Sequence, residues 1–118
     1  EDMKDNVVKD KSLEFAVRIV NLYKFLVNEQ KEFVMSKQIL RSGTSIGANI
    51  REAEQAQSRA DFINKLNIAL KEANETEYWL ELLIRTEYIT REQYESINND
   101  STEINKLLIS IIKTTKNN

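Results

Sequence analysis

Apolar residues recur at helical spacing along most of the chain. In residues 35–53 they stand three or four positions apart, which places them on one side of a helix at about 100° per residue. This side is the predicted core face of the segment and consists of Met35, Ile39, Ser42, Ile46, Ile50 and Ala53. The same spacing before and after this segment predicts that the chain is helical almost throughout.

Three interruptions divide this pattern into four helices. The apolar period lapses for about two turns near residues 28–33. Ser58 and Asp61 form a pair that resembles a capping box, and Thr90 and Gln93 form a second one. Because a capping side chain accepts a hydrogen bond from an N–H group at a helix start, each pair predicts a helix N-terminus. The predicted helices span residues 8–29, 35–57, 60–88 and 91–115.

The lengths of these helices and their short connections indicate the fold. A helix of more than 20 residues is a rod of about 30–40 Å, and short connections force consecutive rods to lie antiparallel. The absence of proline and the presence of only two glycines in 118 residues favour uninterrupted helices. We therefore predict an all-α, up-down-up-down antiparallel four-helix bundle that forms one domain over residues 1–118.

Both glycines, Gly43 and Gly47, line one edge of the core face of the second helix. A glycine costs about 1 kcal/mol relative to alanine inside a helix, so we expect a packing reason for both. If the third helix returns antiparallel, Ala69, Ala73 and Thr76 lie at the same level. Small side chains on both helices then predict a close approach between them. The alternative is a helix that tolerates the glycines or kinks there.

A row of polar residues lines the other edge of the same face. Ser45, Asn49 and Glu52 form this row, and Glu77 lies within the apolar stripe of the third helix. An unpaired carboxylate would be costly there, and Arg41 or Ser45 is within its expected reach. We predict a structural hydrogen-bond network of Ser45, Asn49, Glu52 and Glu77. A solvated edge and a ligand-binding or catalytic site are the alternatives.

The first and third helices carry more apolar residues than one core face requires. In the first helix, Leu13, Ala16, Val17, Val20 and Val27 form one apolar face, and a second row widens it to more than half of the circumference. Large apolar patches usually mark interfaces, often with an aromatic anchor such as Trp79. We predict an interface with a second copy or another protein, formed by Phe15, Ile19, Leu22, Leu26, Trp79, Leu82 and Leu83. The alternative is a wide core face.

Composition excludes most common enzyme chemistry. The chain has no cysteine and no histidine, which removes disulfides, the usual zinc sites and Ser-His or Cys-His catalysis. We therefore predict no catalytic residues, no cofactor and no metal. A magnesium site using Glu72 or Glu75 has only the residue type in its favour. No apolar run is long enough to span a membrane, and the charged N-terminal stretch lacks a signal-peptide core, so we expect a cytoplasmic protein.

The overall charge disfavours a nucleic-acid-binding surface. The net charge is -2, and such surfaces usually show as a basic domain or stripe. Symmetry in an oligomer would repeat each basic side chain and concentrate weak patches. The candidate nucleic-acid contacts are Arg41, Arg51, Arg59, Lys65 and Arg85. The alternative for these residues is an ordinary solvated helix surface.

The segment from residue 36 to 83 contains a specific order of short motifs. An S-I-x-x-N-I-x-E motif is followed by a phenylalanine, an I-A-L tripeptide and an E-x-E pair. These motifs resemble those of the family of bacterial four-helix-bundle proteins known from intervening sequences of 23S ribosomal RNA genes. The positions that carry the resemblance are Ser45, Ile46, Asn49, Ile50, Glu52, Phe62, Ile68, Ala69, Leu70, Glu75 and Glu77.

The resemblance implies a fold and an assembly. It implies a left-handed antiparallel four-helix bundle that forms a ring-like homo-oligomer, in the family a pentamer. The family also resembles an accessory protein of diversity-generating retroelements, which binds nucleic acid and partners a reverse transcriptase through a positively charged barrel. Family members tend to have glycine where this chain has Ala53, so the turn here is expected to differ, with the second helix running on to about residue 57.

These observations favour a non-enzymatic homo-oligomeric scaffold or interaction protein. The alternative is a nucleic-acid-binding accessory protein that uses basic residues repeated around the oligomer. Ribosomal names in the family reflect the location of the genes, so no ribosomal role follows from them.

Overall fold

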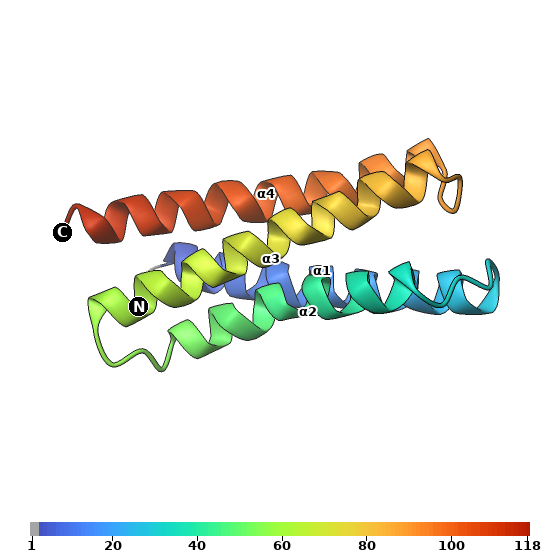
Figure 1. The fold of residues 1–118 in the computed structure, drawn as a ribbon. Helices are drawn as coiled ribbons and strands as arrows, with labels where there is room; N and C mark the ends of the chain where they lie inside the picture. The colour runs from blue at the N-terminus through green and yellow to red at the C-terminus, as the bar shows by residue number, and fades with distance from the viewer. Residues whose placement is uncertain (1–2) are drawn as a thin grey trace.

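Four helices form the described part of the chain (Figure 1). The structure, a computed structural model, describes the backbone of residues 3–118 and the side chains from residue 7 onward. Consecutive helices run in opposite directions, and the neighbouring pairs in this range are α1–α2, α2–α3, α3–α4 and α1–α4. This arrangement confirms the predicted all-α up-down-up-down bundle. The helices are α1 (Met3–Asn28), α2 (Met35–Ala53), α3 (Arg59–Arg85) and α4 (Arg91–Lys116).

All four helices contribute one row of large side chains to the core, which runs the length of the bundle. The fully buried members of this row include Phe15, Ile19, Leu26, Ile39, Ile46, Leu66, Leu80, Leu83, Ile104 and Leu108. On α2 the predicted core face is confirmed, with Met35 partly buried and the other five residues buried. None of the helices in the described range is both long and apolar enough to cross a membrane.

The predicted N-terminal caps of α3 and α4 are present. The Ser58 hydroxyl accepts a hydrogen bond from the backbone N–H of Asp61 at 3.0 Å. Thr90 and Gln93 form a full capping box, in which each side chain accepts a hydrogen bond from the other residue's backbone N–H. These bonds satisfy N–H groups that have no partner inside the helix, which is why the breaks fall there.

The start of α2 uses a cap that the sequence pattern did not indicate. The carboxylate of Glu32, which is 7% exposed, accepts hydrogen bonds from the backbone N–H groups of Val34, Met35 and Ser36. Three N–H groups at one helix start are therefore satisfied by a single side chain from the preceding loop.

α2 and α3 end three or more residues earlier than predicted. α2 ends at Ala53 instead of residue 57, because Ala53 is the last residue of its core face and the chain then turns. α3 ends at Arg85 instead of residue 88, since Glu87 adopts a left-handed backbone with φ of 67°. The Tyr88 N–H then reaches the Leu83 carbonyl at 2.9 Å, in the bond pattern of a Schellman motif that usually has glycine at the left-handed position.

Candidate functional site

The two glycines of α2 pack against α1. A Cβ atom added to Gly43 would lie 2.7 Å from Cγ1 of Ile19, and one added to Gly47 would lie 3.3 Å from Oγ of Ser12. Close packing at the glycines is therefore present, but the predicted partner helix, α3, is wrong. A pattern within one helix does not reveal which neighbour lies along each of its edges.

On its core face, next to Gly43, α2 meets α3 through two small hydroxyl residues. Thr76 Oγ1 donates a hydrogen bond to Ser42 Oγ at 2.9 Å, and both side chains are fully buried. This contact joins the predicted small-residue row of α3 to the core face of α2. It also fixes the height of the two helices relative to each other.

The side chains of three members of the predicted polar network do not bond to one another. Ser45 Oγ donates to the Arg41 carbonyl at 2.6 Å, and Asn49 Nδ2 donates to the Ser45 carbonyl at 2.9 Å, so both side chains bond to their own helix. Glu52 instead pairs with Lys65 of α3 at 3.0 Å. The prediction of one network is wrong, because short polar side chains in a helix reach the carbonyl one turn back.

The fourth member, Glu77, faces α4. Its Oε2 atom accepts hydrogen bonds from Ser101 Oγ at 3.0 Å and from Asn105 Nδ2 at 2.8 Å. A carboxylate within the apolar stripe of α3 does have hydrogen-bond partners, as expected for a half-buried charge. The predicted partners Arg41 and Ser45 are nevertheless wrong, since Glu77 lies on the α4 side of α3.

Arg41 forms a second polar cluster on the α2–α3 surface. Its Nη2 atom lies 2.7 Å from Glu75 Oε1 and 3.3 Å from Glu72 Oε1. The other oxygen of Glu75 accepts a hydrogen bond from Trp79 Nε1 at 3.0 Å. Hydrogen bonds from Arg41 and then from Trp79 lower the pKa of Glu75, and bonds to Glu75 and then Glu72 raise the pKa of Arg41.

The same cluster contains both glutamates of the alternative magnesium site. Glu72 and Glu75, the two carboxylates considered for a metal, both bind Arg41. Among the described side chains, no group of three or more carboxylates is arranged to hold a metal ion. The arrangement can anchor α2 to α3 and orient Trp79, and it resembles a structural ion-pair cluster more than a reaction centre.

Ion pairs engage three of the five candidate nucleic-acid contacts. Arg41, Lys65 and Arg85 each pair with glutamate, and the bond to Glu52 raises the pKa of Lys65. Arg51 and Arg59 are exposed and form no ion pair within residues 7–118. Arg59 and Arg85 begin and end α3, about 39 Å apart at 1.5 Å per residue. One copy of the chain therefore does not gather these residues into a single patch.

The predicted apolar interface lies largely inside the bundle. The four predicted interface residues that are 0–1% exposed are Phe15, Ile19, Leu26 and Leu83. Leu22, Trp79 and Leu82 are partly buried, and Leu22 and Trp79 pack against the core. The prediction is therefore wrong for the four buried residues. Phe15, Ile19 and Leu26 belong to the core row of α1, and Leu83 belongs to the core row of α3. In the other apolar row of α1, Leu13 and Val17 are exposed, and Ala16, Val20 and Val27 are partly buried.

The apolar surplus is real, but other residues carry it. Leu13 and Val17 on α1 are 51% and 54% exposed, and Tyr78 on α3 is 58% exposed. Tyr78 also contacts Trp79 edge-on, with ring centroids 5.0 Å apart. Since α1 and α3 occupy opposite corners of the bundle, these residues form two separate apolar faces. The other exposed large apolar residues are Val7, Phe33, Val34 and Ile109.

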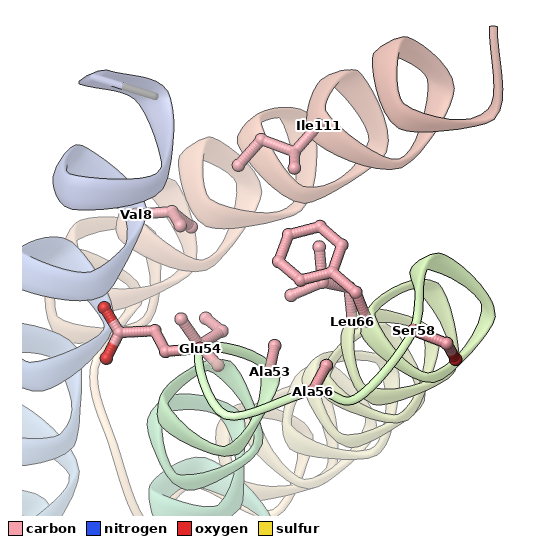
Figure 2. A pocket seen from close by; sticks show the side chains of 9 residues that line it. Val8, Ala53, Glu54, Ala56, Ser58, Leu66 and Ile111 are labelled. Atoms are coloured by element: carbon pink, nitrogen blue, oxygen red, sulfur yellow. The ribbon is translucent and has the colours of Figure 1, made fainter. Parts of the chain in front are cut away.

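A hollow of about 240 Å³ opens at the end of the bundle where α2 connects to α3 (Figure 2). Glu54 lies at this hollow with its carboxylate 3.1 Å from Lys9, and Ser58 is the cap of α3. Both polar side chains that line it thus serve the fold. The remaining lining residues are apolar and are Val8, Ile50, Ala53, Ala56, Phe62, Leu66 and Ile111.

Comparison with known proteins agrees with the resemblance seen in the sequence. A family model described as 23S rRNA-intervening sequence protein matches residues 4–110. A crystal structure of a protein with unknown function from the S23 ribosomal protein family of Bacteroides thetaiotaomicron VPI-5482 is 98% identical, with a TM-score of 0.91. That match covers 94% of this chain and 96% of the other. No curated protein matches the chain. Because the family model spans most of the sequence, the chain belongs to the family of 23S rRNA-intervening sequence proteins.

Proposed function

We propose that the chain is a non-enzymatic cytoplasmic scaffold that assembles into a homo-oligomer. The observation that carries the proposal is the pair of exposed apolar faces, Leu13 and Val17 on α1 and Tyr78 on α3. Apolar side chains exposed together on a helix face gain free energy when a partner covers them. Five copies is the number that the family resemblance implies.

The positions of the two faces favour a ring. They lie on helices at opposite corners of the bundle and differ in composition, so each copy carries two unlike faces. Unlike faces pair head to tail, and a head-to-tail contact closes into a ring when its rotation permits. The non-enzymatic part of the proposal is supported by the carboxylates and bases of the α2–α3 surface, which pair with one another.

The test is the mass of the particle in solution, measured by light scattering after size-exclusion chromatography. We expect a defined oligomer for the wild type and smaller particles for Val17→Glu and Tyr78→Glu. Ile109→Glu is the matched control, because Ile109 is 55% exposed and lies on α4, which carries neither face. Thermal unfolding followed by circular dichroism verifies that each variant is folded. A wild type that stays monomeric at all concentrations would overturn the proposal.

A second candidate function is nucleic-acid binding by the assembled oligomer. Arg51 and Arg59, exposed on either side of the α2–α3 connection, favour it, since a ring would repeat both in every copy. Fluorescence anisotropy with labelled single-stranded RNA tests this function. Binding that weakens steeply with salt and is lost in an Arg51→Glu/Arg59→Glu variant would support it. No binding at low salt would exclude it for this probe.

A further inference from the structure

Residues on the outer faces of α1 and α3 can be matched by their position along the long axis of the bundle. Gly43 of α2 packs against Ile19 of α1, and the adjacent Ser42 bonds to Thr76 of α3. Ile19 and Thr76 therefore lie at about the same height in the bundle. Both helices run in the same direction and rise about 1.5 Å per residue, so positions equally distant from these two residues also share a height.

Opposite charges occupy matching heights on the two faces. Five residues before Ile19 and Thr76 stand Glu14 on α1 and Lys71 on α3. Five residues after them stand Lys24 on α1 and Glu81 on α3. All four charged side chains are exposed. Along the bundle, Glu14 and then Lys24 follow one another on α1, whereas Lys71 and then Glu81 follow one another on α3, where Glu81 also pairs with Arg85 of its own helix at 2.9 Å.

Apolar side chains occupy the heights between these charges. Val17 is two residues before Ile19, so it lies at the height of residue 74 on α3, which is two residues before Thr76. A long side chain on a helix points back toward the N-terminus and covers the turn before its own Cα. The exposed ring of Tyr78, four residues further along α3, therefore leans back toward the height of Val17. An apolar centre with a charged pair on each side is the usual anatomy of a specific interface.

We propose that the α1 face of one copy packs in parallel on the α3 face of the next copy. Glu14 then lies opposite Lys71 of the next copy, and Lys24 lies opposite Glu81 of the next copy. This inference rests on the proposed self-assembly and specifies its surfaces and direction. In a ring whose axis runs along the helices, cyclic symmetry keeps neighbours parallel and at equal height, so residues of equal height meet. The charges set the direction, because an antiparallel contact would bring like charges together.

Charge reversal tests the pairing. Glu14→Lys and Lys71→Glu each create repulsion, whereas the double variant restores an opposite pair. Sedimentation velocity over a concentration series at about 50 mM salt, where exposed charges are weakly screened, gives the concentration of half-assembly. We expect a roughly tenfold rise for each single variant and a return to near the wild-type value for the double variant. Lys106→Glu, the same change at an exposed site on α4, is the control and should have no effect.

The outcomes separate this inference from the proposed function. A monomeric wild type would refute self-assembly itself. A wild-type oligomer that none of the variants weakens would refute the α1–α3 pairing and leave self-assembly standing. Weakening by Glu14→Lys without weakening by Lys71→Glu would also refute it, since α1 would then contact something other than α3. If circular dichroism shows that a variant is unfolded, Lys24→Glu and Glu81→Lys provide a second, independent pair.

Discussion

Ser42 and Thr76 share a hydrogen bond inside the hydrophobic core, with their hydroxyl oxygens 2.9 Å apart and both side chains fully buried. A buried hydroxyl without a partner is costly, so each residue depends on the other and on nearby carbonyls. Thr76 Oγ1 also lies 2.8 Å from the Glu72 carbonyl, and Ser42 Oγ lies 3.5 Å from the Ile39 carbonyl. The pair connects α2 to α3 at a point where neither helix has a large side chain.

Thr76→Val should lower the free energy of unfolding by about 1 kcal/mol, because it removes the hydrogen bond while keeping the shape of the side chain. The change is measured by urea denaturation followed by circular dichroism. Ser42→Ala combined with Thr76→Val should cost less than the sum of the single changes, since no hydroxyl is then left unpaired. Additive costs would show that the two hydroxyls do not interact.

Gly43→Ala should destabilise the fold by about 1–3 kcal/mol, because the new Cβ would lie 2.7–3.0 Å from three atoms of the fully buried Ile19. Gly47→Ala should cost less, since its nearest contact is 3.3 Å and alanine gains about 1 kcal/mol of helix propensity. Urea denaturation of both variants gives the comparison. Equal costs would indicate that the helices separate readily at Gly43.

Glu75→Gln should change how stability depends on pH. The pKa of Glu75 is lowered from its ordinary value of 4.5, so the charged carboxylate stabilises the fold above that pH, and the contribution is lost as the pH falls through the folded pKa. The variant should be less stable than the wild type at pH 7, and the difference should shrink below pH 4.5. Denaturation at several pH values measures it. A pH-independent difference would contradict this account, and Glu29→Gln, at an exposed site, is the control.

The fold was accessible from the sequence because its signals are local. The caps at Ser58 and Thr90 use residues three positions apart, and the core face of α2 repeats within one helix. The cap of α2 gives no signal in the sequence, because Glu32 lies in a loop and matches no capping motif. The left-handed Glu87 gives no signal either, since glycine is the residue expected at that position.

The α1 residues predicted as an interface lie in the core row of that helix, and the sequence contains a signal for this row. A row that alternates steps of four and three residues is the pattern of a seam between packed helices, and on α1 it gives Val8, Ser12, Phe15, Ile19, Leu22 and Leu26. Ser12 is the polar member of this row and interrupts its apolar pattern. The need for a small residue at Ser12 comes from Gly47 on another helix.

The polar contacts depended on distances between helices that no pattern within one helix contains. Glu77 lies within the core stripe of its own helix, yet its partners come from α4, 24 and 28 residues away. The sequence predicts Arg41 as a partner for Glu77, whereas in the structure Arg41 pairs with the neighbouring Glu72 and Glu75. The sequence therefore predicts that the Glu77 carboxylate needs a hydrogen-bond partner, but it does not predict which residue is that partner.

The cap formed by Glu32 also limits how the connection between α1 and α2 can change in evolution. Surface loops normally accept insertions and deletions, because their length matters little to the helices they join. Here the side chain that completes the start of α2 comes from the loop itself, two to four residues before its backbone partners. One residue added or removed between Glu32 and Met35 would displace the carboxylate from all three N–H groups. We therefore expect homologous chains that keep this glutamate to keep its spacing from α2 as well.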